Sequence, residues 1–237
     1  MKVCILFIYS DDIIYNSMLE IQQKYVHKFN NVDSYFIKMN NLQNDDIIIN
    51  DDIISIKGNE TLYNILYKTV KSFELLFDNN YDFFVRSNIS TIIDINQLLD
   101  VLEKLPKTNY YGGANIMNLQ WYGSGIVDKT YFGLNFTSGI GIILSTDIVK
   151  HFILNKDKID YSIVDDVSIS IYLHKNIPES INNFLKYKHL THNLYTNILD
   201  LDKDSFDKNI IFYRNKTIGD RKLDTLLMNH IVNIIYK

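Results

Sequence analysis

The sequence predicts a single α/β domain with a mixed, mostly parallel central sheet. Buried strands alternate with amphipathic helices over the first half, as expected when helices connect parallel strands. The second half mixes shorter strands with helices, and no Pro-, Gly- or Ser-rich linker divides the chain. A length of 237 residues suits one large core. We therefore expect one domain over residues 1–237.

The first half begins with a continuous apolar run that predicts a buried strand at residues 3–10. A helix follows, reaching about residue 28. Apolar residues at helical spacing predict a second helix over residues 61–77. A third helix, over residues 95–105, is stopped by Pro106.

Three further segments complete the first half. Residues 34–39 and 82–85 are predicted strands. Residues 45–56 contain two Asp-Asp-Ile-Ile units, which we interpret as strand and turn material that arose by chance.

The second half is less regular. We expect a strand pair within residues 110–122, an apolar segment with glycines at 137–145 and a late strand at 210–213; the predicted helices are residues 147–154, 165–174 and 221–236.

Composition excludes several classes of protein. The net charge of −4 leaves no broad basic surface for nucleic acid. No apolar run reaches the ~18 residues of a membrane span. The one cysteine, Cys4, excludes a disulfide framework within the chain and favours a reducing compartment, so we predict the cytoplasm, or the host cytoplasm for a viral protein.

The most informative segment is residues 81–91, where an apolar strand ends in Arg86, Ser87, Asn88 and Ser90. Open α/β sheets bind ligands beyond the carboxyl ends of their strands. These side chains offer donors and neutral acceptors, which suit phosphate and sugar oxygens. The segment therefore indicates a binding site for a nucleotide-sugar.

A pair of acids, Asp165 and Asp166, opens the helix predicted at 165–174. Acids in a first turn often only complement the helix dipole and cap free N–H groups. In the functional interpretation, one carboxylate is a general base that takes a proton from an acceptor hydroxyl. Both interpretations stay open at this point, and one acid can cap while the other reaches a cleft.

Other candidate groups are scattered along the chain. Lys68, Arg214 and Lys216, together with Arg86, are cations that can neutralise a diphosphate. Gly139 and Gly141 permit close approach of the backbone either to a sugar or to a packed helix. His189 and His192 have the spacing of metal ligands on a helical turn, but no further metal motif supports a zinc site.

Four pieces in order resemble the fringe and β-1,3-galactosyltransferase group of GT-A glycosyltransferases, especially its short soluble viral and bacterial relatives. The pieces are Lys57-Gly58 with Lys68-Thr69, residues 83–91, residues 136–145 and Asp165-Asp166-Val167. They span about residues 55–175, and Tyr213 to Lys216 resembles a basic strand end of the short relatives. The resemblance implies a Rossmann-like GT-A fold with a nucleotide-sugar-binding half at about 1–105 and an acceptor-binding half at about 106–237.

The resemblance also implies roles for particular residues. It implies an inverting reaction with Asp166 as the preferred base and Asp165 as the second choice. The residues implied in nucleotide-sugar binding, the first three of them at the base (most often uridine), are Tyr9, Ser10, Asp11, Lys68, Arg86, Ser87, Asn88, Ser90, Arg214 and Lys216. Those implied on the acceptor side are Gly112, Gly113, Ser138 and Gly139.

One departure from the family concerns the metal. The larger family coordinates manganese with the aspartates of a DxD motif, whereas this chain has Asn88, Ile89 and Ser90 there. Hard cations prefer charged oxygen ligands, so we expect a divalent cation (Mn or Mg) to bind weakly or not at all. Asn88 and His192 are the candidate ligands. Asp94, six residues after Asn88, is an alternative acid that is also placed to begin the next helix, and nearby cations are the alternative to a metal.

The sequence thus predicts a glycosyltransferase that moves a sugar from a nucleotide-sugar, most simply a UDP-sugar, to a glycan hydroxyl. The alternative is a catalytically inactive GT-A-like module that binds glycans or nucleotides. A nucleotidyltransferase ranks lower, because residues 9–12 after the first strand contain no glycine for a phosphate loop.

Overall fold

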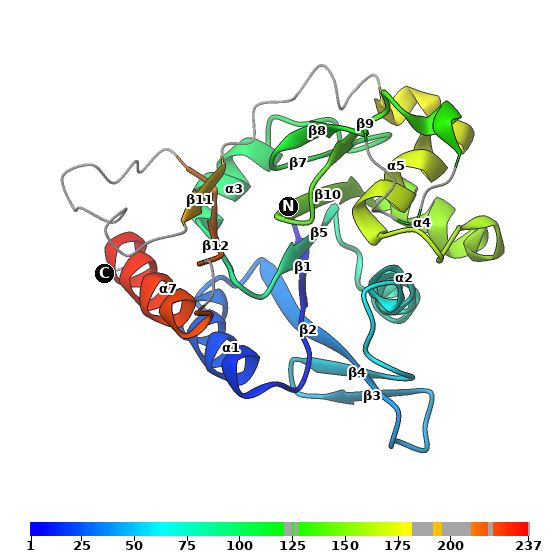
Figure 1. The fold of residues 1–237 in the computed structure, drawn as a ribbon. Helices are drawn as coiled ribbons and strands as arrows, with labels where there is room; N and C mark the ends of the chain where they lie inside the picture. The colour runs from blue at the N-terminus through cyan, green and yellow to red at the C-terminus, as the bar shows by residue number, and fades with distance from the viewer. Residues whose placement is uncertain (121–124, 126–127, 182–191, 196–209, 218–219, 237) are drawn as a thin grey trace.

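The structure is a computed structural model that describes residues 1–120, 125, 128–181, 192–195, 210–217 and 220–236. Within this part of the chain, seven strands form a central sheet in the order β3-β4-β2-β1-β5-β10-β7 (Figure 1). The strands are β1 (Val3–Ile8), β2 (Val32–Asn40), β3 (Ile47–Asn50), β4 (Ile53–Lys57), β5 (Phe83–Asn88), β7 (Tyr111–Gly113) and β10 (Gly141–Ser145). β1, β2, β4 and β5 run parallel, whereas β3, β10 and β7 pair antiparallel with their neighbours. The predicted α/β class with a mixed, mostly parallel sheet is confirmed.

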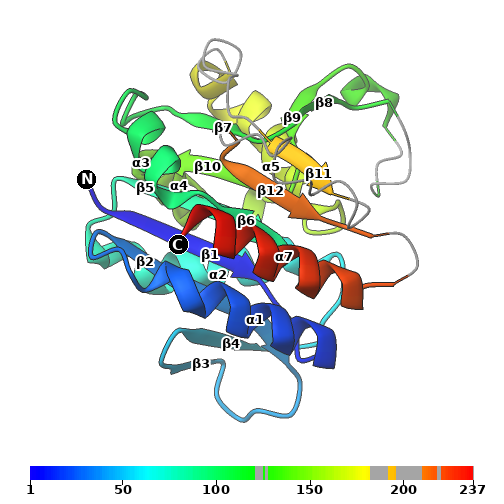
Figure 2. The same cartoon turned by 90° about the vertical axis from the view of Figure 1, so that its left-hand side faces the viewer.

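Helices cover both faces of this sheet (Figures 1 and 2). One face carries α1 (Ile13–Val26), α3 (Ile95–Leu102) and α7 (Lys222–Ile235), and the other carries α2 (Asn64–Leu76), α4 (Thr146–Leu154) and α5 (Asp165–Asn176). In β1, Ile5 and Phe7 pack into the first core, while Cys4 and Leu6 pack into the second. Burial on both faces explains why this strand is apolar throughout. Among the described residues, no helix is both long and apolar enough to cross a bilayer.

Smaller elements complete the fold. A three-stranded sheet joins β6 (Thr91–Ile93), β12 (Phe212–Asn215) and β11 (His192–Tyr195), and a two-stranded one joins β8 (Ile116–Asn118) and β9 (Asn135–Thr137). Single 3₁₀ turns lie at η1 (Phe77–Asn79), η2 (Lys129–Tyr131) and η3 (Lys156–Lys158). β12 runs antiparallel to β6, with Arg214 opposite Thr91. This pairing carries a late segment of the chain to the end of β5.

Residues 45–56 form the β3–β4 edge hairpin, in agreement with the predicted strand and turn material, and its turn has Asp51 in the left-handed region (φ 54°). Two local predictions were wrong. Residues 110–122 contain β7 and β8, which pair with β10 and β9 and not with each other. β5 continues through Asn88, because β1 and β10 both offer backbone partners as far as Ser87. Arg86 and Ser87 are therefore strand residues and do not lie beyond the strand end.

Candidate functional site

A cavity of about 340 Å³ opens beyond the carboxyl ends of β1 and β5. The chain leaves β1 for β2 on one side, while β5 lies on the other, so this is the switch point where open α/β sheets bind ligands. The lining residues are Ile8, Tyr9, Ser10, Tyr15, Glu60, Thr61, Leu62, Ile65, Asn88, Ile89, Ser90, Arg214 and Arg221. They come from the end of β1, α1, the approach to α2 and its first turn, the end of β5 and the last part of the chain.

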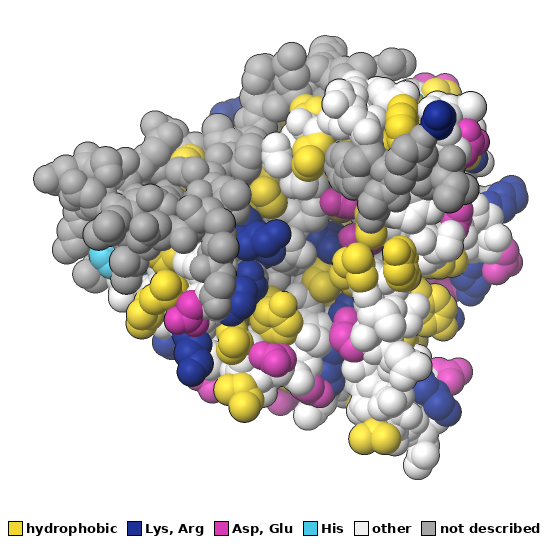
Figure 3. Space-filling view, in the orientation of Figure 1, with side chains coloured by type: hydrophobic (Ala, Val, Ile, Leu, Met, Phe, Trp, Pro, Cys, Tyr) yellow, Lys and Arg dark blue, Asp and Glu magenta, His cyan; other side chains and the backbone are white. Residues whose placement is uncertain are grey.

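Two arginines meet on one hydroxyl in this cavity. Arg214 donates from Nη1 to Ser90 Oγ, and Arg221 Nη2 lies 3.3 Å from the same oxygen. Burial, reinforced by the nearby Arg221, lowers the pKa of Arg214 to about 10. Figure 3 shows Lys and Arg side chains around a hollow near the centre of this face. The cavity therefore carries positive charge at its β5 side.

Arg221 is also anchored behind the cavity. Its Nη1 pairs with Asp224 Oδ2 at 2.9 Å, and Asp224 is fully buried and accepts hydrogen bonds from the Thr217 backbone and hydroxyl. The Tyr15 ring lies 5.9 Å from the Arg221 guanidinium. These contacts fix the guanidinium while leaving part of it facing the cavity.

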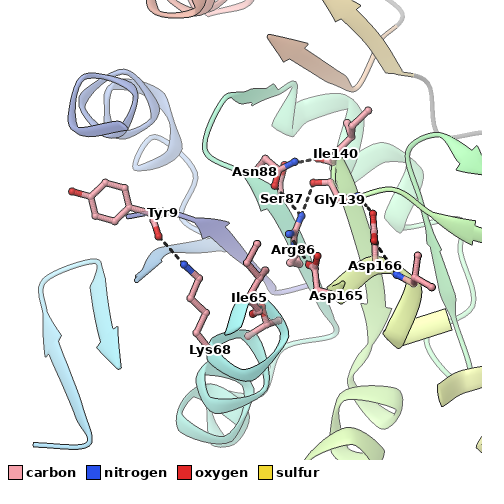
Figure 4. A network of polar contacts seen from close by, with 12 residues as sticks. Tyr9, Ile65, Lys68, Arg86, Ser87, Asn88, Gly139, Ile140, Asp165 and Asp166 are labelled. Carbon is pink, nitrogen blue, oxygen red and sulfur yellow. Dashed lines mark hydrogen bonds and ion pairs between the residues drawn. The ribbon is translucent and has the colours of Figure 1, made fainter. Parts of the chain in front are cut away.

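Arg86, in contrast, is neutralised within the protein (Figure 4). Its side chain is 3% exposed, and its Nη2 lies 2.6 Å from Asp165 Oδ2. Its Nη1 donates to Gly139 O at 2.6 Å and to Asn88 Oδ1 at 3.1 Å. The structure thus brings together the strand tip and the acid pair, but it uses Arg86 and Asp165 as a buried ion pair.

Lys68 is similarly occupied. Its ammonium is buried and donates to Tyr9 O at 2.8 Å and to Glu60 Oε1 at 2.6 Å. Burial lowers the pKa of Lys68, although the Glu60 carboxylate opposes this effect. Lys68 therefore ties α2 to the end of β1, and its charge is already balanced.

Asp166 stands beside this cluster and is partly exposed. Its Oδ1 accepts from Val167 N at 2.9 Å, and its Oδ2 accepts from Gly139 N at 3.2 Å. Burial, and then the Asp165 charge, raise the pKa of Asp166 to about 6. A carboxylate has lone pairs beyond these two bonds, so Asp166 can still accept a proton. It does not line the 340 Å³ cavity itself.

The residues at the end of β5 do not suit a hard divalent cation. Asn88 Oδ1 faces the Arg86 guanidinium, so a cation there would meet a positive charge. Among the described residues, no group of three or more His, Cys, Asp or Glu side chains is placed to hold a metal ion. Asp94 caps α3, accepting from Gln97 N at 3.1 Å. His192 begins strand β11, not a helical turn, and its side chain, like all of His189, lies outside the described residues.

Of the three residues predicted to contact the nucleotide base, two line the cavity and one does not. Tyr9 and Ser10 line the cavity, and the Tyr9 hydroxyl contacts Asp11 and Asn16. Asp11 itself is exposed and pairs with Lys38 at 2.6 Å.

Two other nucleotide candidates do not reach the cavity. The Ser87 hydroxyl turns away to donate to Ile140 O at 2.6 Å. Lys216 is exposed and is not among the lining residues.

The acceptor-side glycines are sites of tight packing. A Cβ on Gly112 would lie 2.2 Å from the Tyr110 hydroxyl, and one on Gly113 would lie 2.0 Å from Gly141 O. A Cβ on Gly139 would lie 2.4 Å from Arg86 Nη1. The close approach expected at Gly139 is therefore made by a guanidinium. Ser138 lies beside it, with Oγ 3.4 Å from Ala114 O.

Sequence reasoning missed Arg221, Tyr15 and Glu60. Arg221 was counted only as the start of the last helix, and no motif surrounds any of the three. A usable signal was the basic pair Arg214 and Arg221 flanking a segment that joins a strand to a helix.

A larger hollow of about 600 Å³ lies at the opposite edge, beside the start of β2 and the residues Asp33, Asp52 and His27. It is remote from the ends of β1 and β5. We assign the candidate site to the smaller cavity because it lies at the switch point of the sheet and is lined by Arg214 and Arg221, which meet on a neutral hydroxyl.

Comparisons with known proteins add little. No family model matches the sequence, and no curated protein matches it. Among solved structures, the chain is similar to 2-C-methyl-D-erythritol 4-phosphate cytidylyltransferase from Francisella tularensis, with 10% identity and a TM-score of 0.40. The alignment covers 73% of this chain and 87% of that chain. A likeness at this level carries no information about substrate or reaction.

Proposed function

We propose that this protein is a glycosyltransferase that moves a sugar from a nucleotide-sugar, most simply a UDP-sugar, to a glycan hydroxyl with inversion. The observation that carries the proposal is a continuous chain of contacts from the cavity wall to a candidate base. Asn88 lines the cavity and accepts from Arg86, Arg86 donates to Gly139 O, and Gly139 N donates to Asp166.

Asp166 is the proposed general base. A base works best when its pKa lies near the working pH, and the pKa of about 6 suits this role better than that of an ordinary carboxyl. In an inverting displacement, the acceptor oxygen attacks the anomeric carbon and gives its proton to Asp166. The bond from that carbon to the diphosphate breaks, and its electron pair leaves with the diphosphate.

Asp165 is the proposed positioning residue. Its carboxylate holds Arg86, and its negative charge contributes to the raised pKa of Asp166. This division of labour follows from burial: Asp165 is buried and paired, whereas Asp166 is partly exposed.

One observation favours the second candidate, a binding module without turnover. Asp166 does not line the cavity, and both its oxygens already accept backbone N–H groups. Such a module would bind a nucleoside diphosphate in the same cavity and release no product.

The test is release of UDP from a panel of UDP-sugars, with and without simple glycan acceptors, in EDTA and in manganese. Glycosyltransferase activity predicts acceptor-stimulated UDP release with at least one donor. Binding of UDP without release from any donor favours the module. Absence of both release and binding would overturn both candidates.

A further inference from the structure

The cavity has more positive charge than the fold neutralises. Its charged lining residues are Glu60, Arg214 and Arg221. The charge of Glu60 is balanced by an ion pair with Lys68. One nitrogen of the Arg221 guanidinium forms an ion pair with Asp224. Within the part of the chain that the structure describes, no carboxylate forms an ion pair with Arg214. The described residues therefore leave one positive charge at the cavity without a counter-charge.

Two guanidinium groups that share one neutral hydroxyl repel each other. Ser90 Oγ can accept hydrogen bonds from both, but it carries no charge to offset theirs. An anion in the cavity would remove this imbalance. Planar guanidinium groups present parallel N–H donors that match the oxygens of a phosphate, and two of them side by side suit two linked phosphates.

We propose that Arg214 and Arg221, with Ser90 between them, bind the diphosphate of the donor directly, in place of a divalent cation. This inference rests on the proposed function and names the groups that neutralise its leaving diphosphate. The guanidinium N–H groups stabilise the negative charge that grows on the diphosphate oxygen as the bond to the anomeric carbon breaks. Arg86 and Lys68 cannot take this role without losing their carboxylate partners.

The cavity volume fits this use. About 340 Å³ lies within the range of small-molecule sites. Tyr15 and Arg221 also border a neighbouring hollow of about 200 Å³, so space continues past the arginine pair. The hydroxyl of Ser90 already aligns both arginines before any ligand arrives, which lowers the cost of ordering them on binding.

The experiment is isothermal titration of the full chain with inorganic pyrophosphate and with UDP, in EDTA and then in manganese. The test variants are Arg214→Gln, which removes the unpaired charge, and Arg221→Lys, which keeps a cation for buried Asp224 but removes the planar fork. The matched control is Lys222→Gln, because Lys222 is an exposed cation directly after Arg221. Thermal melting checks that each variant is folded.

The inference predicts binding of both probes in EDTA, with no more than about a twofold gain in manganese. Arg214→Gln should weaken both probes about tenfold or more, in line with loss of one charge-assisted contact. Arg221→Lys should weaken them less, and Lys222→Gln should leave them within about twofold of the unchanged protein.

Three outcomes separate the inference from the function on which it rests. Binding that requires manganese and is equal in Arg214→Gln and the unchanged protein overturns the inference and leaves the glycosyltransferase proposal standing. Binding in EDTA that depends on Arg214, without any UDP release from UDP-sugars, supports the arginine site and overturns the proposed activity. Failure of both probes to bind under either condition overturns the inference.

Discussion

Two arginine clusters border the same end of the sheet and differ in how their charge is met. Arg86 lies in β5, 3% exposed, against the carboxylate of Asp165. Arg214 lies in β12 against the hydroxyl of Ser90, with Arg221 beside it. A cation at a ligand-binding edge is available to a ligand only when the fold has not already neutralised it. We therefore call Arg86 and Asp165, with Asp166 beside them, the structural cluster. We call Arg214 and Arg221, with Ser90 between them, the open cluster.

The first and largest expected effect tests the catalytic side of the structural cluster. Asp166→Asn should reduce turnover by about 10²–10⁴-fold with little change in UDP affinity, because the amide cannot accept the proton. Steady-state kinetics and UDP titration measure the two quantities. Asp157→Asn, which changes an exposed acid in η3, is the control and should keep full activity. Near-normal turnover in Asp166→Asn would remove this residue from the mechanism.

The second prediction concerns the stability of the structural cluster. Asp165→Asn leaves the buried Arg86 guanidinium without its counter-charge, which typically costs about 3–5 kcal/mol in free energy of unfolding. Urea denaturation measures the change. A combined Arg86→Met and Asp165→Leu variant should recover much of the loss, since it removes both charges. A loss below about 1 kcal/mol in the single variant would mean that the ion pair is not the support we describe.

The third prediction uses the raised pKa of Asp166. Because the base must be deprotonated, kcat/KM should fall about tenfold per pH unit below about pH 6 and level off above it. The pKa in the folded protein lies above the usual carboxyl value of 3.8, so the stability from Asp166 is fully present below that value and is lost as the pH rises through about 6. A rate profile that stays flat down to pH 4.5 would contradict the assignment.

The smallest expected effect is at the open cluster. Arg214→Gln should change the free energy of unfolding by less than about 0.5 kcal/mol, because no carboxylate among the described residues pairs with Arg214 and its removal relieves repulsion with Arg221. The same urea titration used for Asp165→Asn gives a direct comparison. A loss as large as that of Asp165→Asn would erase the distinction between the two clusters.

Much of the fold was predictable from periodicity, because the central strands are buried on both faces and the helices are amphipathic. The short strands β6 and β9 were not recognised, and β7 and β8 were predicted with the wrong partners, since three residues hold too little pattern and their pairing depends on distant segments. Residues 45–56, with their two Asp-Asp-Ile-Ile units, were predicted as strand and turn material, and they form the edge hairpin with Asp51 in its turn.

The sequence identified residues that lie near the site, but it did not indicate which of their charges pair with one another. Arg86 and the Asp165–Asp166 pair, which the sequence marked as separate candidates, lie together in the structure, although none of the three lines the cavity. The sequence did not indicate that Asp165 forms an ion pair with Arg86, or that Glu60 forms one with Lys68. Ion pairs between distant residues depend on how the chain packs. Arg221 reaches the cavity only because the β12–β6 pairing brings its segment there.

Gly139 connects the buried ion pair and the proposed base through a single residue. Its carbonyl receives Arg86 and its amide reaches Asp166, and the space where a methyl would sit is filled by the guanidinium. We therefore expect substitutions at positions 86 and 139 to occur together among distant relatives. A chain that loses the arginine becomes free to carry a side chain at 139, and with it a differently tuned acid at 166.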